Sequence, residues 1–213
     1  MARVRKIHRH PQDGRNFYLV DACFLANRVI PPSLAPQGKE REGDRIRRCQ
    51  EWWAEIDDQL KHDCARVYMP DICIAEAFKV LAKKYYMEGW FKKAGDLDRA
   101  RRELSDVVRT NTRSLQLGSR DVRFHDISTN RDIIVGVDRF FELFMKRKVN
   151  PSIPDLIVLA TAKYLLEFFD IPRGQLHIVT MDLRLREGAA RAADLPNAYD
   201  PTLKSHRVAA VFM

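Results

Sequence analysis

Short apolar segments separated by long helical patterns are the feature that most restricts how this 213-residue chain can fold. The three clearest segments are residues 17–20, 66–69 and 176–180, and each is rich in Val, Ile, Leu, Tyr or Met. Such short, mostly apolar runs are typical of strands that are buried on both faces. Strands of this kind, joined through helices, form a mostly parallel sheet. We therefore expect an α/β fold with three layers (αβα) and about four or five strands in the central sheet.

Weaker patterns complete the expected order of elements. Two further strands are predicted at residues 122–125 and in the tail at 208–212. Helical periodicity predicts five longer helices, at residues 43–63, 71–90, 96–112, 130–148 and 154–169. The last of these is apolar on most of its circumference, so we expect it to lie deepest in the protein.

The breaks between these patterns do not indicate separate domains. Pro and Gly interrupt the chain at residues 30–38, 150–154 and 170–175, but none of these stretches is typical of an interdomain linker. We therefore expect residues 1–213 to form one domain. Within it, residues 1–15 would form a basic N-terminal arm, and residues 91–150 an extended helical region.

Composition narrows the class of protein. Hydrophobic residues make up 46% of the chain and charged residues 31%, as in a folded globular protein. No apolar run approaches the roughly 20 residues that span a bilayer, and no signal-type segment follows the basic N-terminus, so we expect a cytoplasmic protein without a membrane partner. The four cysteines form no CxxC pair, which argues against a disulfide or zinc framework. The net charge of +8 favours polyanionic partners.

Four carboxylates fall where such a sheet would gather them. Asp21 directly follows the first strand, Asp182 follows the strand at 176–180, Asp155 lies at the start of the deepest helix, and Glu76 lies beside the apolar stripe of helix 71–90. Ligands of open parallel sheets bind at the carboxyl ends of the strands. A cluster of buried carboxylates needs a cation or must stay protonated. Oxygen ligands alone suit Mg²⁺ or Mn²⁺.

Each acid also has a purely structural interpretation. Asp155 forms a capping-box pattern with Ser152, and Asp21 and Asp182 are each suited to cap a short helix that follows. Glu76 is placed to pair with Lys79. Taken singly, each acid favours the structural role, and only the set of four favours a metal site.

The motifs that contain these acids, taken in order, resemble the PIN domain, the fold of VapC-type toxin ribonucleases and of related RNA-processing nucleases. They read "VDAC", "PDICIAE", "PDLIVLATA" and "VTMD", and the resemblance covers residues 16–200. It implies that Asp21, Glu76, Asp155 and Asp182 are catalytic ligands of one or two Mg²⁺ or Mn²⁺ ions. It also implies that the Thr180 hydroxyl orients a carboxylate or a water. The chain departs from the family at Cys23, where Ser or Thr is common.

The same resemblance implies a function. The expected activity is metal-dependent hydrolysis of phosphodiester bonds in single-stranded or structured RNA. The chain would act either as the toxin of a toxin–antitoxin pair, with an antitoxin protein as partner, or as a housekeeping nuclease. Members of the family often associate through their helices, so a homodimer or higher oligomer is expected. The alternative is a catalytically inactive PIN-like module that binds RNA or serves as a scaffold.

Other phosphotransfer classes fit less well. A haloacid-dehalogenase-type phosphatase needs a second Asp where Cys23 stands, and a receiver domain needs an acidic pair near its first strand. The chain has no GxxxxGK[ST] loop, which excludes a Walker-type NTPase.

Several groups of basic residues are candidates for substrate binding. Arg184 and Arg186 follow Asp182 directly, so we expect at least one of them to contact phosphate. Four other clusters lie within helical patterns, where each either forms a solvated face or contacts nucleic acid: Arg45, Arg47 and Arg48; Lys92 and Lys93; Arg99, Arg101 and Arg102; and Lys146, Arg147 and Lys148.

Overall fold

A five-stranded sheet in which all neighbouring strands are parallel forms the centre of the computed structural model, which describes residues 14–116, 124–146 and 151–209. The strand order is β3-β2-β1-β4-β5. The strands are β1 (Asn16–Val20), β2 (Ala65–Pro70), β3 (Phe124–Ile127), β4 (Leu176–Val179) and β5 (Ala198–Tyr199). The predicted parallel α/β fold is thus confirmed.

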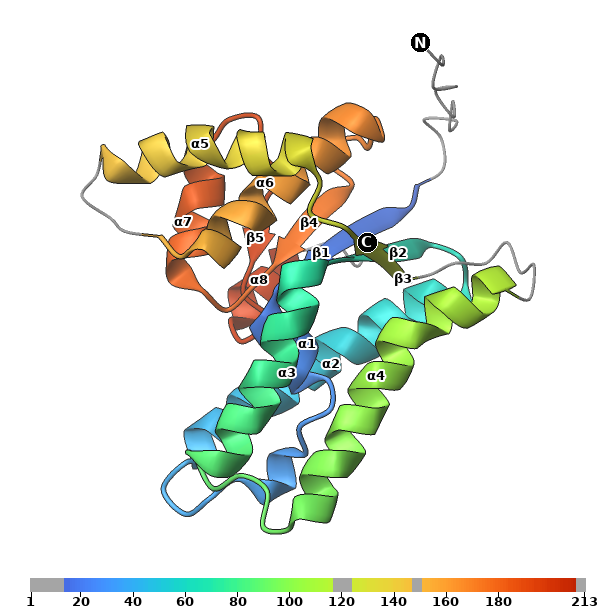
Figure 1. Cartoon of the computed structure of the whole chain (residues 1–213), viewed down its shortest axis with the longest axis vertical. Helices are drawn as coiled ribbons and strands as arrows, with labels where there is room; N and C mark the ends of the chain where they lie inside the picture. The colour runs from blue at the N-terminus through green and yellow to red at the C-terminus, as the bar shows by residue number, and fades with distance from the viewer. Residues whose placement is uncertain (1–13, 117–123, 147–150, 210–213) are drawn as a thin grey trace.

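Helices cover both faces of this sheet (Figure 1). One face carries α1 (Ala22–Asn27), the short 3-10 helix η1 (Pro32–Leu34), α2 (Glu40–Lys61), α3 (Asp71–Tyr86) and α4 (Ala94–Gln116). The other carries α5 (Arg131–Met145), α6 (Ile153–Phe168) and α7 (Leu183–Arg191). A last helix, α8 (Lys204–Ala209), follows β5.

The alternation of side chains along β1 explains the two cores. Tyr18 and Val20 pack with α1, α2 and α4, whereas Phe17 and Leu19 pack with α5, α6 and α7. Successive side chains of a strand point to opposite faces, so one short apolar strand contributes to both layers.

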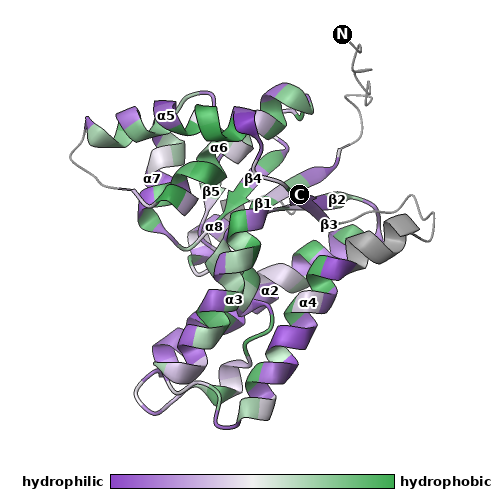
Figure 2. Cartoon of the chain, in the orientation of Figure 1, coloured by the Kyte–Doolittle hydropathy of each residue, from purple (hydrophilic) through white to green (hydrophobic). Residues whose placement is uncertain are grey.

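Figure 2 shows α6 as mostly hydrophobic along its length, and its residues 156–162 are all buried. The prediction that this helix lies deepest is confirmed.

Several predicted elements are displaced or wrong. The strand expected at 122–125 is observed as β3, two residues later, with 122 and 123 outside the described residues. The tail strand expected at 208–212 is wrong for 208 and 209, which belong to helix α8, and 210–213 lie outside the described residues. The edge strand β5 was not predicted. Most of the basic arm expected at 1–15 also lies outside the described part of the chain.

The order of the strands places a topological switch point between β1 and β4. From β1 the chain proceeds to β2 and β3 on one side of the sheet, and then crosses through α5 and α6 to β4 and β5 on the other side. The helices that follow β1 and β4 therefore cover opposite faces. In an open α/β sheet, the carboxyl ends of the strands at such a switch point are the usual ligand site. Asp21 and Asp182 follow these two strands.

None of the described helices is long and apolar enough to cross a membrane.

The packing of α7 against α5 and α6 gives a test of the fold. A Cβ atom added at Gly188 would collide with the ring of Phe144 and lie 3.2 Å from Leu159 Cδ1, and both neighbours are buried. We expect Gly188→Ala to lower the free energy of unfolding by about 1–3 kcal/mol, as overpacking does. Gly136→Ala in α5 is the matched control, because its Cβ would lie at an ordinary 3.6 Å from Ala160 Cβ. Urea unfolding of both variants measures the difference, and an undiminished stability of Gly188→Ala would contradict the packing.

Candidate active site

Asp21 lies at the centre of the carboxyl edge and is only 8% exposed. It is the N-cap of α1: one carboxylate oxygen, Oδ1, accepts a hydrogen bond from the backbone N–H of Phe24 at 2.6 Å. The other oxygen, Oδ2, accepts from the hydroxyl of Thr180 at 2.5 Å. Thr180 is fully buried, and its Oγ1 accepts from the backbone N–H of Asp182 at 2.9 Å. One chain of hydrogen bonds therefore joins the residues that follow β4 to the carboxylate that follows β1.

The two other aspartates are fixed at helix starts. Asp182 is the N-cap of α7, where Oδ1 accepts from the backbone N–H groups of Arg184 at 2.6 Å and Leu185 at 3.2 Å. Asp155 forms the predicted capping box of α6: its N–H donates to the hydroxyl of Ser152 at 3.3 Å, and the backbone N–H of Ser152 donates to its Oδ2 at 3.2 Å. The Ser152 hydroxyl also donates to that oxygen at 2.6 Å. The capping roles predicted for these residues are confirmed. Helix capping therefore fixes the direction of each carboxylate.

Glu76 differs because it lies within α3 rather than at a helix start. It is half-buried and close enough to Lys79 for that ammonium group to favour its ionised form. Burial has the larger effect, however, and together with the nearby Asp155 carboxylate it raises the pKa of Glu76.

The acids share one electrostatic environment. Burial raises the pKa of Asp21 to about 6, and the charges of Asp182 and Asp155 add to the increase. Burial also raises the pKa of Asp155, with a further contribution from Asp182. The structure thus brings together Asp21, Asp155, Asp182 and Glu76 closely enough for their charges to interact. Repulsion between like charges and desolvation both oppose ionisation here.

These residues fit a hard divalent cation by donor type and by charge, because they offer carboxylate oxygens whose mutual repulsion a cation would relieve. They do not form a finished coordination shell. Within the described ranges, no three His, Cys, Asp or Glu side chains are arranged so as to hold an ion.

A hollow of about 280 Å³ opens beside Asp21 and Asp182. Its remaining lining residues come from α1, from α2 and from the end of β4: Cys23, Asn27, Glu42, Arg45 and Met181. Cys23 is an exposed free thiol here. Sequence patterns did not indicate Asn27, Glu42 or Met181. The proximity of Glu42 to Asp21 depends on the packing of α2, and that of Met181 depends on the pairing of β4 with β1.

The two arginines after Asp182 have different surroundings. Arg184 is exposed, and its positive charge lowers the pKa of Asp155, so it lies near the acids. Arg186 instead forms an ion pair at 3.1 Å with the buried carboxylate of Asp200. Arg186 is thus engaged with a carboxylate of the protein, whereas Arg184 is exposed beside the acids.

Comparison with models of protein families finds no match. Comparison with curated proteins also finds none. Among solved structures, the chain is similar to VapBC2 from Rickettsia felis, crystallised with a DNA fragment from their promoter, with 10% sequence identity and a TM-score of 0.47. The alignment covers 86% of this chain and 98% of the other. At this identity and score, the similarity establishes neither a family nor an activity.

The raised pKa of Asp21 predicts how the metal-free protein responds to pH. The folded state binds the Asp21 proton more tightly than the unfolded state, so stability is lost as pH rises from about 4 to about 6 and then stays constant. Asp21→Asn removes the charge and keeps an oxygen to cap α1. We expect this variant to exceed the wild type in stability above pH 6, by up to about 3 kcal/mol, and to converge with it near pH 4. Chemical denaturation with EDTA across this range measures the effect.

Asp194→Asn is a control for which the opposite change in stability is expected. Desolvation by burial raises the pKa of Asp194, but the hydrogen bonds from Arg139 and Lys163 together outweigh it and hold the pKa at about 2. Neutralising it should therefore lower stability at neutral pH. A lower stability of Asp21→Asn than of wild type at pH 7.5 would contradict an unfavourable charge at Asp21.

Proposed function

We propose that this protein is a PIN-type nuclease that hydrolyses phosphodiester bonds of RNA with Mg²⁺ or Mn²⁺. The observation that carries the proposal is the electrostatic coupling of Asp21, Glu76, Asp155 and Asp182, which come from four separate elements at the switch point of a parallel sheet. Helix capping alone explains each aspartate singly. It does not explain why the acids gather where their charges oppose one another.

The four carboxylates would hold one or two metal ions. When bound, Mg²⁺ or Mn²⁺ would supply Lewis-acid chemistry: it lowers the pKa of water, binds the scissile phosphate and neutralises charge on the leaving oxygen. Thr180 keeps the Asp21 carboxylate oriented through its 2.5 Å hydrogen bond. Arg45, which lines the hollow, and Arg184 carry positive charges that favour an approaching phosphate.

The choice of RNA rests on the resemblance of the sequence motifs to PIN domains, whereas the net charge of +8 favours RNA and DNA alike. A toxin role, an antitoxin partner, self-association and a cytoplasmic location stay predictions that rest on the resemblance to PIN domains and on composition.

A second function has its own supporting observation. Three of the acids hold helix starts through hydrogen bonds of their carboxylates, and no described set of three side chains is arranged to hold an ion. A PIN-like module that binds RNA or acts as a scaffold without cleaving would show this arrangement.

Cleavage of labelled RNA separates the two functions. We expect the wild type to cleave single-stranded RNA with Mg²⁺ or Mn²⁺ and to stop on addition of EDTA. Asp21→Asn and Asp155→Asn should each lower the rate at least about 100-fold, since each removes a ligand charge. Asp138→Asn, an exposed residue of α5, is the matched control and should be unaffected. A DNA oligonucleotide of the same sequence tests the preference for RNA.

Two results would contradict the nuclease proposal. One is the absence of metal-dependent cleavage, and the other is undiminished cleavage by both site variants. Binding of RNA without cleavage at any metal concentration would favour the scaffold function.

A further inference from the structure

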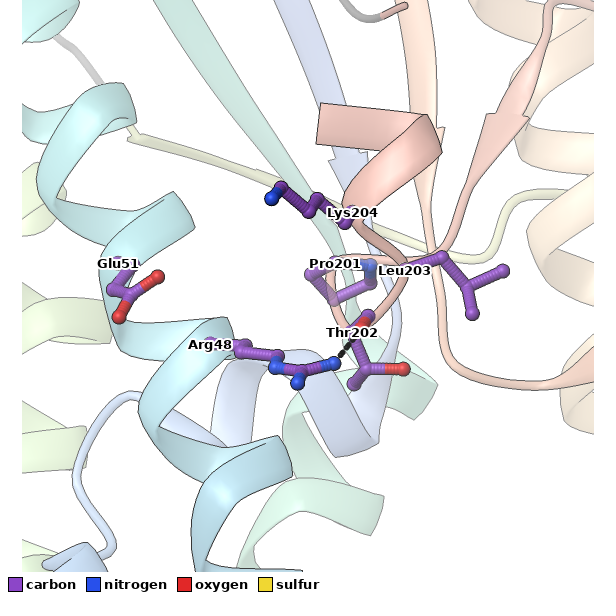
Figure 3. A pocket seen from close by; sticks show the side chains of 6 residues that line it. All are labelled: Arg48, Glu51, Pro201, Thr202, Leu203 and Lys204. Carbon is purple, nitrogen blue, oxygen red and sulfur yellow. Dashed lines mark hydrogen bonds between the residues drawn. The ribbon is translucent and has the colours of Figure 1, made fainter. Parts of the chain in front are cut away.

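A second hollow lies at the carboxyl end of β5, beside the same helix that borders the acids. It has a volume of about 230 Å³. Arg48 and Glu51 line it from α2, and residues 201–204, which follow β5, line it from the opposite side (Figure 3). Neither the sequence motifs nor the proposed metal ligands account for this hollow.

Helix α2 connects the two hollows. Arg45 lines the hollow beside Asp21, and Arg48 lines the second one. Residues three apart on a helix lie on the same face, about 4.5 Å apart along the axis. The opposite walls also adjoin, because they follow β4 and β5, which are neighbours in the sheet. The two hollows therefore follow one another along the carboxyl edge.

The loop after β5 is held rigidly by buried polar contacts. Oδ1 of Asp200 accepts hydrogen bonds from the backbone N–H of Thr202 at 2.8 Å and from its hydroxyl at 2.6 Å. Oδ2 of the same carboxylate pairs with Arg186 of α7 at 3.1 Å. Arg186 is thus a positioning residue, which ties the loop of the second hollow to the helix that Asp182 caps.

The positive charges of Arg48 and Lys204 are not neutralised by a carboxylate that the structure describes. Arg48 donates from Nη1 to the carbonyl oxygen of Thr202 at 2.7 Å, a contact that fixes the guanidinium without neutralising it (Figure 3). Lys204 is exposed and forms no ion pair with any carboxylate that the structure describes. By contrast, Arg47 on the same helix pairs with Asp44 at 2.9 Å. Glu51 supplies one carboxylate to the lining, so the hollow contains two cations and one anion.

We propose that Arg48 and Lys204 bind a backbone phosphate next to the scissile one, so that the nucleic acid strand runs from the acids along α2 toward β5. The adjacency to a scissile phosphate rests on the proposed nuclease function. A guanidinium has five N–H donors, so Arg48 retains several for phosphate while it contacts Thr202.

Binding of a fluorescein-labelled single-stranded RNA of about ten nucleotides tests the subsite. Fluorescence anisotropy in EDTA measures affinity while preventing metal-dependent cleavage. Arg48→Gln and Lys204→Gln should each weaken binding about three- to ten-fold and make the slope of log K against log salt shallower by about 0.7. Lys204→Gln leaves the Arg48–Thr202 hydrogen bond intact, so a disturbed loop cannot account for its effect. Arg47→Gln, which removes a cation already paired, is the matched control.

The outcomes separate this proposal from the nuclease proposal. Undiminished affinity in both Arg48→Gln and Lys204→Gln, an equal loss in Arg47→Gln, or no binding by the wild type would each overturn the subsite. If the wild type binds as expected but cleaves with neither metal, the phosphate site stands and the nuclease proposal fails. If it cleaves, the subsite variants should raise KM more than they lower kcat, since a remote phosphate contact is made in ground state and transition state alike.

Discussion

The hydrogen bond between Thr180 and Asp21 is the contact on which the carboxyl edge of the sheet depends. It joins a fully buried hydroxyl after β4 to a buried carboxylate after β1, across the point where the helices diverge to opposite faces. It also favours the ionised form of Asp21, although burial outweighs it and raises the pKa to about 6. A sheet selected for stability alone would place an uncharged cap there. Carboxylates held against their own desolvation are typical of functional sites.

The capping roles and the proposed ligand roles are compatible because capping fixes where a carboxylate points. Asp21 and Asp182 are N-caps and Asp155 lies in the first turn of its helix, and those helices start at one edge of the sheet. The fold thus gathers negative charge through local contacts, without long side chains reaching across the protein. In each of these carboxylates at least one oxygen accepts a hydrogen bond from a backbone N–H group or a hydroxyl.

Local patterns in the sequence predicted the parts of the protein that depend on local interactions. The strands at β1, β2 and β4, the burial of α6 and the Ser152–Asp155 capping box all follow from residues close together in the chain. The two-residue strand β5 is too short to show a period. The apolar pattern of residues 208–212 resembled a strand, but residues 208 and 209 belong to helix α8.

Long-range contacts account for what the sequence did not reveal. Arg186 pairs with Asp200, whose position depends on the path of the chain after α7. The second hollow brings Arg48 together with Thr202, which is 154 residues away in sequence. No spacing rule connects such residues before the fold is known.

The most direct test of the account compares the melting temperatures of the wild type and Asp21→Asn at pH 7.5, with EDTA and with saturating Mn²⁺. If the acids gather to hold a cation, Mn²⁺ should raise the melting temperature of the wild type, corresponding to about 2.7 kcal/mol at a hundred times the dissociation constant. The variant should gain much less, so that the wild type, less stable in EDTA, becomes the more stable of the two with metal. A wild type whose melting temperature does not respond to Mn²⁺ would contradict the claim that these carboxylates form a metal site.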